Sequence, residues 1–170
     1  MSPSRAAPPF RVLQSSIHGS GVFATRPIAR GTRLIEYVGE RISHEEADRR
    51  YEHKADDDNH TFLFTVDAHT VIDGGVGGNE SRYVNHGCDP NCETVVDDGR
   101  IYIEAIRDIA AGEELAYDYC LERDADDPPD IEAVFSCRCG AARCRGTMLL
   151  PPQRATLRPR RPRRLERRRA

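Results

Sequence analysis

Short stretches of alternating hydrophobic and polar positions recur along the first two thirds of the chain. β-Branched and aromatic residues dominate these stretches, and Gly, Asp or Pro separates one from the next, which is typical of short β-strands. The sequence therefore predicts a mainly β fold with little helix. Strands are expected over residues 21–25, 33–38, 61–66, 71–72 and 100–106.

Two local signals add a hairpin and a helix to this pattern. Residues 97–99 (Asp-Asp-Gly) separate two β-branched stretches and predict a hairpin turn. Ser43 is followed three residues later by Glu46, which is a capping-box pattern, and no Gly or Pro occurs from there to about residue 55. We therefore expect one helix, beginning directly after Ser43.

Two segments of the chain resemble each other. Residues 24–34 and 105–115 match at six of eleven positions, and Gly31 and Gly112 occupy equivalent places in them. Glycine permits a turn at such a place. A shared strand–turn–strand solution is therefore favoured over true duplication as the explanation of so short a match.

Composition narrows the class of protein. The chain has 170 residues, of which 38% are hydrophobic and 31% charged, so one folded domain with a modest core is expected. No stretch approaches the roughly 18 consecutive apolar residues that cross a bilayer, and the first residues lack the apolar region of a secretory signal. These features exclude an integral membrane protein and favour a reducing, intracellular compartment. The six cysteines are then thiols or metal ligands rather than disulfides.

The net charge of −3 conceals two regions of opposite sign. Residues 151–170 contain nine Arg and one Glu, a net charge of +8, which leaves 16 of the 25 basic and 27 of the 28 acidic side chains in the remainder, a net charge of −11. An acidic body favours a cationic partner, and a basic tail favours an anionic one such as nucleic acid. The Pro and Arg content of the tail also indicates a disordered, solvated segment, and the two interpretations are compatible.

Three cysteines lie within eight residues near the end of the predicted folded region. Cys137, Cys139 and Cys144 form a C-x-C-x₄-C cluster, and a tetrahedral zinc ion would need one further ligand. The candidates for that ligand are Cys88, Cys92, Cys120 and His86. The alternatives are three thiols without a metal or an adventitious disulfide, but the spacing in a reducing compartment favours the metal site.

Three further motifs place polar groups on turns or strand ends. Asn85 and His86 lie in the segment RYVNHGCDPNC, which suits a polar ligand but is equally compatible with a rigid polar turn. Residues 18–21 (His-Gly-Ser-Gly) form a glycine turn that lets the backbone approach a ligand, a weak signal alone. In ELAYDY, Tyr117 and Tyr119 share one face of an extended segment, as ordinary half-buried strand tyrosines also would.

In this order, the motifs HGSGVFA, EYVGE, RYVNHGCDPNC, ELAYDY and C-x-C-x₄-C closely resemble the SET-domain protein lysine methyltransferases with a post-SET zinc segment. The resemblance covers about residues 16–149, and nothing in the chain resembles the cysteine-rich pre-SET segment of many such enzymes. Gly87 stands where the family usually has Ser. The resemblance implies a SET-domain fold of several small curved sheets, with a knot-like crossing where the Asn-His and Tyr-Asp-Tyr segments meet.

The expected organisation follows from the resemblance and the charge pattern. A monomer is expected, located in the cytoplasm or nucleoid of a bacterium, or in the nucleus or chromatin of a host if it is delivered as an effector. The single lysine, Lys54, fits a GC-rich bacterial genome or an enzyme that avoids methylating itself. The predicted regions are a flexible leader (1–14), a SET domain (15–122), an acidic linker (123–136), a post-SET zinc segment (137–149) and a disordered Arg-rich tail (150–170).

The resemblance also implies an activity and its cofactors. Family members transfer a methyl group from S-adenosylmethionine to a lysine ε-amine, here in a basic protein such as a histone or a histone-like protein. One structural zinc ion would be held by Cys88, Cys137, Cys139 and Cys144. The cofactor would be bound by His18, Gly19, Ser20 and Gly21 at its methionine part, by Asn85 and His86 at its amino and adenine ends, and also by Phe62 and Tyr119.

The three remaining implied roles belong to tyrosines. Tyr119 matches the catalytic tyrosine of the family, Tyr37 would line the same lysine channel, and Tyr117 occupies the position that sets the number of methyl groups added. A Tyr at this position favours mono- or dimethylation. Neutral hydroxyl dipoles suit a reaction that mainly requires a neutral amine to be positioned in line with the methyl group. The alternative is a catalytically silent peptide-binding module with a nucleic-acid-binding tail.

Overall fold

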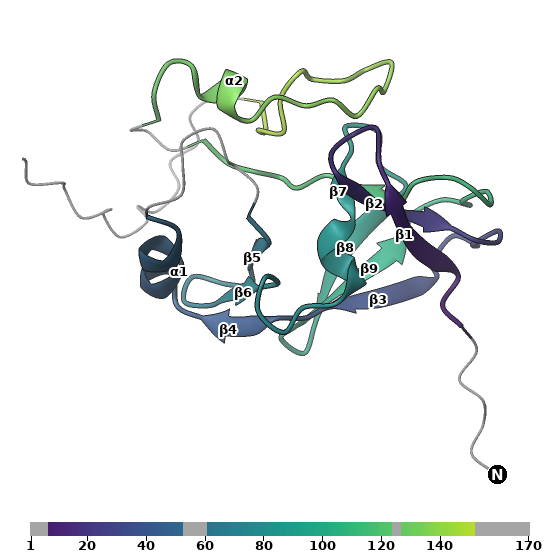
Figure 1. Cartoon of the computed structure of the whole chain (residues 1–170), viewed down its shortest axis with the longest axis horizontal. Helices are drawn as coiled ribbons and strands as arrows, with labels where there is room; N and C mark the ends of the chain where they lie inside the picture. The colour runs from purple at the N-terminus through teal and green to yellow at the C-terminus, as the bar shows by residue number, and fades with distance from the viewer. Residues whose placement is uncertain (1–6, 53–60, 124–126, 152–170) are drawn as a thin grey trace, which may run out of the picture.

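The structure is a computed structural model that describes residues 7–52, 61–123 and 127–151. Four small β-sheets dominate the described part of the chain (Figure 1). The predicted Arg-rich tail lies almost wholly outside the described residues, as does Lys54. None of the described helices combines the length and the apolar character needed to span a membrane.

The elements follow one another as short strands with few helical turns, as the hydrophobic pattern predicts. Antiparallel pairing forms the sheets β1-β2, β3-β9-β8 and β4-β6-β5, while β7 and β10 pair in parallel. The strands are β1 (Phe10–Gln14), β2 (Ser20–Ala24), β3 (Arg33–Tyr37), β4 (Glu40–Ile42), β5 (Leu63–Thr65), β6 (Val71–Asp73), β7 (Asn85–His86), β8 (Cys92–Asp97), β9 (Arg100–Ala105) and β10 (Ala116–Tyr117), and the helices are α1 (His44–Tyr51), the 3₁₀ helix η1 (Glu80–Tyr83) and α2 (Ile131–Val134).

The prediction of a flexible leader over residues 1–14 is wrong for its last five residues. These residues form β1, which pairs with β2 so that Phe10 lies opposite Ala24. The Phe10 side chain is buried in the main core beside Val22. Its apolar ring therefore makes this end of the chain part of the domain.

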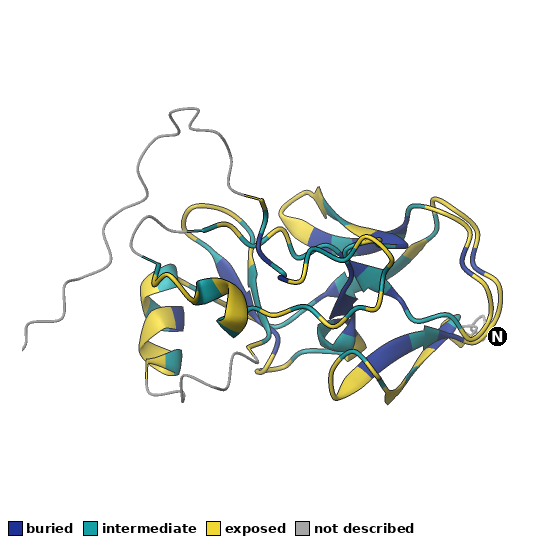
Figure 2. Cartoon of the chain, turned by 90° about the horizontal axis from the view of Figure 1, so that it is seen from above, coloured by how far each residue is buried: buried dark blue, intermediate teal, exposed yellow. Residues whose placement is uncertain are grey.

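The predicted hairpin and helix are both confirmed. Asp98 and Gly99 have φ values of 48° and 70° and connect β8 to β9, as a tight hairpin turn requires. Ser43 caps α1 by accepting the backbone N–H of Glu46 at 3.1 Å. The helix is largely exposed (Figure 2), and an ion pair of 3.1 Å between Arg50 and the buried Asp73 anchors it to β6.

The two self-similar segments lie against each other rather than in separate parts of the fold. Ile28 and Ile109 form an antiparallel bridge with both backbone hydrogen bonds at 2.9 Å. The glycines at the two equivalent turns, Gly31 and Gly112, have φ values of 80° and 86°, in the left-handed region that favours glycine. The pairing brings residues 24–34 and 105–115 into one core.

The predicted crossing forms where β7 and β10 run side by side, and Asn91 fixes it. The Asn91 side-chain oxygen accepts the N–H of Ala116 at 2.9 Å, and its side-chain amide donates to the carbonyl of Glu114 at 2.8 Å. Asn91 is buried, so these bonds satisfy groups that water cannot reach. The crossing places the Asn-His pair beside the tyrosine-bearing strand.

The segment after the predicted acidic linker folds back over the crossing. Residues 127–151 form the upper layer in Figure 1, and the stretch predicted as linker contains α2. Leu149 is buried and bridges in parallel to Leu121, while the N–H of Leu150 donates to the Leu121 carbonyl at 2.8 Å. The C-terminal described segment is therefore attached to the chain just beyond the tyrosine-bearing strand.

Candidate functional site

Aromatic rings form a continuous row beside the crossing. The ring centroids of Tyr37 and Phe64 are 5.2 Å apart, those of Phe64 and Tyr117 are 6.5 Å apart, and those of Tyr117 and Tyr119 are 4.9 Å apart. The three predicted tyrosines come from β3, β10 and the residues after β10, and the fold brings them together. Phe64 from β5 completes the row.

The hydroxyl groups of these tyrosines are uncharged and differ in their partners. Tyr37 donates to the Phe62 carbonyl at 2.8 Å, and Tyr119 donates to the Val84 carbonyl at 2.9 Å. Within the described chain the Tyr117 hydroxyl has no hydrogen-bond partner. Burial raises the pKa of all three tyrosines above their ordinary value, so the row is neutral at physiological pH.

Asn85 is held in one orientation by its side-chain amide. Its Nδ2 donates to the carbonyl of Ser20 at 3.0 Å and to the Glu114 carboxylate at 2.8 Å. A third contact at 3.5 Å reaches the His18 carbonyl. With Nδ2 saturated, Oδ1 is left as an acceptor without a partner in the described part of the chain, and this atom can take a donor such as an ammonium group.

The predicted glycine turn lies directly beside Asn85. Gly19 has a φ of 43° and open space around the position where a Cβ would stand. At Gly21 a Cβ would lie 2.2 Å from the Glu114 carboxylate, so no larger residue fits without moving that group. The turn therefore has room for a ligand at Gly19, while Gly21 permits the approach of the side chain that holds Asn85.

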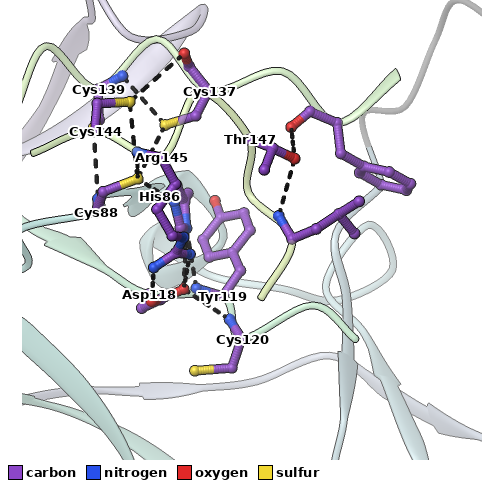
Figure 3. A network of polar contacts seen from close by, with 12 residues as sticks. His86, Cys88, Asp118, Tyr119, Cys120, Cys137, Cys139, Cys144, Arg145 and Thr147 are labelled. Carbon is purple, nitrogen blue, oxygen red and sulfur yellow. Dashed lines mark hydrogen bonds and ion pairs between the residues drawn. The ribbon is translucent and has the colours of Figure 1, made fainter. Parts of the chain in front are cut away.

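His86 is neutral, and its ring links the crossing to the cysteines (Figure 3). Its Nδ1 accepts the N–H of Tyr119 at 3.1 Å, and its Nε2 lies 3.4 Å from the Cys88 sulfur. Burial lowers the pKa of His86, and an Nδ1 that accepts a hydrogen bond carries no proton, so the nearby Asp118 does not make it cationic. Both ring nitrogens are engaged, so any cofactor contact would involve the backbone of His86.

The four cysteines that the resemblance implies as ligands converge on one point (Figure 3). Their sulfur atoms all lie within 4.8 Å of one another, and the Cys88 sulfur is 3.7 Å from that of Cys137 and 3.9 Å from that of Cys144. A tetrahedron with Zn–S distances of about 2.3 Å has edges of about 3.8 Å. The fourth member is Cys139, and the donor set fits a structural zinc ion.

The other ligand candidates lie outside this tetrahedron. Cys92 is buried in the main core, where burial raises the pKa of its thiol to about 12. Cys120 is exposed and belongs to the turn after Tyr119.

Phe62, which the resemblance implies near the cofactor, packs edge-on against Tyr83 with a centroid distance of 5.8 Å. Its carbonyl accepts the Tyr37 hydroxyl, and its cofactor contact stays a prediction.

Four residues that shape the site were not predicted from the sequence. Phe64 could have been found from the alternation in TFLF, because it shares a strand face with Phe62. Glu114 is within the ELAYDY motif, yet nothing local indicates that it reaches Asn85. The ion pair between Asp118 and Arg145 joins residues far apart in the chain and has no local signal.

The fold and the site together define a class of protein: a mainly β domain in which a neutral tyrosine row and a four-cysteine cluster meet at a crossing of two segments. Residues 19–120 match the SET domain family. The chain therefore belongs to the SET domain family, as its motifs predict.

Curated relatives and a solved structure agree with this assignment. The chain is 43% identical over 143 residues to the "Histone-lysine N-methyltransferase, H3 lysine-4 specific" of Eremothecium gossypii, a match that covers 81% of this chain and 14% of that protein. The Saccharomyces cerevisiae protein with the same description is also 43% identical, with 81% and 13% covered. The chain thus spans about a seventh of the length of these relatives.

The similar solved structure is described as ctPRC2 in an autoinhibited conformation bound to S-adenosylmethionine. It has a TM-score of 0.60 and 36% sequence identity, and the match covers 67% of this chain and 15% of that chain. The likeness supports the SET-domain fold of small sheets.

Proposed function

We propose that this chain is an S-adenosylmethionine-dependent protein lysine methyltransferase that acts on a basic protein, a histone or a histone-like protein. The observation that carries the proposal is the neutral tyrosine row, whose last member Tyr119 donates to the carbonyl of Val84, the residue before Asn85 with its free amide oxygen. The relatives whose names describe histone H3 lysine-4 methylation support the substrate class. The −11 charge outside the last 20 residues suits a cationic peptide.

The residues that would hold the cofactor are those around the glycine turn. Asn85 Oδ1 would accept from an ammonium group, and the open backbone at Gly19 would lie along the ligand. When bound, S-adenosylmethionine supplies an electrophilic methyl group on a sulfonium centre. The S-adenosylmethionine-bound relative supports this assignment.

The tyrosines would position the lysine amine rather than accept a proton in the transfer step. Each buried hydroxyl is uncharged, so no fixed charge competes with the amine for orientation. The Tyr119 hydroxyl donates a hydrogen bond to the Val84 carbonyl, which leaves its oxygen lone pairs free to face positive charge. Such preorganised dipoles stabilise the partly positive transition state without any rearrangement. Tyr37, held by the Phe62 carbonyl, would line the same channel.

Direct methyl transfer tests the proposal. The full chain, loaded with zinc, is incubated with S-adenosylmethionine labelled in its methyl group and with a histone H3 peptide, core histones or bacterial nucleoid proteins. We expect label on lysine side chains, located by mass spectrometry, and no label on a matched peptide with Arg in place of each Lys. Cofactor binding without transfer to any of these proteins would contradict the proposal and favour a silent peptide-binding module.

Tyr117 is proposed to limit the product to mono- or dimethyl-lysine. Its hydroxyl has no partner in the described part of the chain, so it can hold a water molecule that crowds the amine. In Tyr117→Phe we expect a higher methylation state on the same lysine, with total turnover within about tenfold, since one hydroxyl interaction contributes about 0.5–1.5 kcal/mol. Mass spectrometry of the product measures this. The same mono-, di- and trimethyl distribution in both proteins would disprove the role of Tyr117.

A further inference from the structure

Arg145 connects the cysteine cluster to the tyrosine-bearing strand. It follows Cys144 directly, and its side chain points away from the cluster toward Asp118 (Figure 3). The guanidinium forms two hydrogen bonds with the Asp118 carboxylate, at 2.6 and 2.9 Å. Each side chain is 23% exposed. Paired, charge-assisted bonds in a shielded place are stronger than ordinary surface ion pairs.

The backbone of Arg145 touches the cluster itself. Its N–H donates to the Cys88 sulfur at 3.4 Å. One residue therefore contacts a cluster sulfur through its main chain and the strand of Tyr119 through its side chain. In the described chain the hydrogen bonds of the guanidinium all go to Asp118, and its buried Nε atom has no partner there.

Asp118 in turn holds the backbone directly after Tyr119. The carboxylate accepts the N–H of Cys120 at 3.0 Å. Cys120 has a φ of 52°, which is uncommon for a residue other than glycine and needs such support. The N–H of Tyr119 itself is held by His86 Nδ1. The position of the Tyr119 ring therefore depends on a turn that Asp118 stabilises.

We propose that the Arg145–Asp118 pair is a latch that positions Tyr119 against the cysteine segment. Arg145 and Asp118 are positioning residues, and Tyr119 is the residue on which they act. The effect of the latch on methyl transfer rests on the proposed function, whereas its effect on the order of the Cys120 turn and residues 137–149 does not. When the pair is broken, the turn at Cys120 and residues 137–149 both loosen, although the four cysteines are unchanged.

Three variants test the latch in the full zinc-loaded chain: Asp118→Asn, Arg145→Gln and the double variant. Removing either partner is expected to raise the KM for S-adenosylmethionine and the Kd for S-adenosylhomocysteine about tenfold, the usual cost of losing a group that orients a ligand set. Hydrogen exchange should rise in peptides covering both 117–123 and 137–149. Because both changes break one interaction, the double variant should resemble either single variant.

Glu132→Gln is the matched control. Glu132 pairs with Arg123, which also lies just after the tyrosine-bearing strand, but Glu132 is 61% exposed. A pair whose carboxylate is exposed to solvent contributes little, so KM, Kd and exchange should stay as in the wild type. Arg145→Lys keeps the positive charge but cannot form the bidentate hydrogen bonds with Asp118. It should therefore recover only part of the affinity for S-adenosylhomocysteine. Zinc content should be one ion per chain in every variant.

Distinct outcomes separate the latch from the proposed function. Additive effects in the double variant, or increased exchange confined to 117–123, would overturn the latch. A fall in kcat that matches the unfolded fraction, with KM unchanged, would show a merely stabilising pair and also overturn it. If the wild type transfers no methyl group but the exchange of both peptides rises together, the proposed function fails and the latch stands.

Discussion

Replacing Tyr119 with Phe is expected to lower the rate of methyl transfer by about 10² to 10³, the typical cost of removing one preorganised dipole from an active site. The Tyr119 hydroxyl donates to the Val84 carbonyl at 2.9 Å, which leaves its lone pairs free to accept from positive charge in the proposed reaction. The ring is kept in Tyr119→Phe, so its packing against Tyr117 at 4.9 Å remains. Steady-state kinetics with labelled cofactor measures the loss.

Cofactor affinity separates a catalytic effect from a general one. The Kd of Tyr119→Phe for S-adenosylhomocysteine, measured by calorimetry, should stay within about tenfold of the wild type, since one hydroxyl contributes about 0.5–1.5 kcal/mol. Tyr102→Phe is the matched control, because Tyr102 lies on β9 of the β3-β9-β8 sheet under Arg33, whose guanidinium is 4.1 Å from the ring centroid. Its turnover should be unchanged. Turnover of Tyr119→Phe at the wild-type level would remove this tyrosine from the catalytic role.

Removing zinc is expected to abolish methyl transfer while the body of the domain stays folded. The apparent binding free energy of a structural zinc site is about 10–16 kcal/mol, and in this chain it would fix residues 137–149 over the crossing. The main core draws its members from residues 10–119, so it does not depend on the cysteine segment. Chelation should therefore free the segment to proteolysis with little change in the β circular dichroism.

A cysteine variant provides the matched comparison for chelation. Cys88→Ser removes a thiolate of the cluster and should lower both zinc content and turnover at least tenfold. Cys120→Ser changes an exposed thiol outside the tetrahedron and should keep both at the wild-type level. Full activity of a zinc-free chain would refute a role of the metal in completing the site, and global unfolding on chelation would refute the independence of the core.

The sequence predicted correctly those elements that depend on interactions between residues close together in the chain. Ser43 and Glu46 give the helix start because a cap is satisfied within one turn, and residues 97–99 give the hairpin because only a few residue types adopt its angles. The motifs also predicted the tyrosines and the cysteine set. By contrast, β1 escaped prediction because its burial depends on pairing with β2 and not on its own composition.

Long-range side-chain contacts are the other part that the sequence could not predict. Glu114 orients Asn85 across 29 positions of chain, and Arg145 reaches Asp118 across 27. Each depends on the crossing, and the crossing was predicted by resemblance to a family rather than by periodicity. A motif identifies the residues that carry the chemistry, while the groups that hold them in place become visible only in three dimensions.

The pairing of residues 24–34 with residues 105–115 has a consequence for how the chain acquires its fold. The N–H of Leu115 donates to the Val22 carbonyl at 2.7 Å, and the buried side of β2 is completed by residues that are synthesised much later. Contacts between distant positions slow folding, because the loop must close before the contact repays the lost entropy. During synthesis, β1 and β2 therefore lack the residues that cover their buried side until residues 105–115 have left the ribosome. The hydrophobic interior and the tyrosine row then form together.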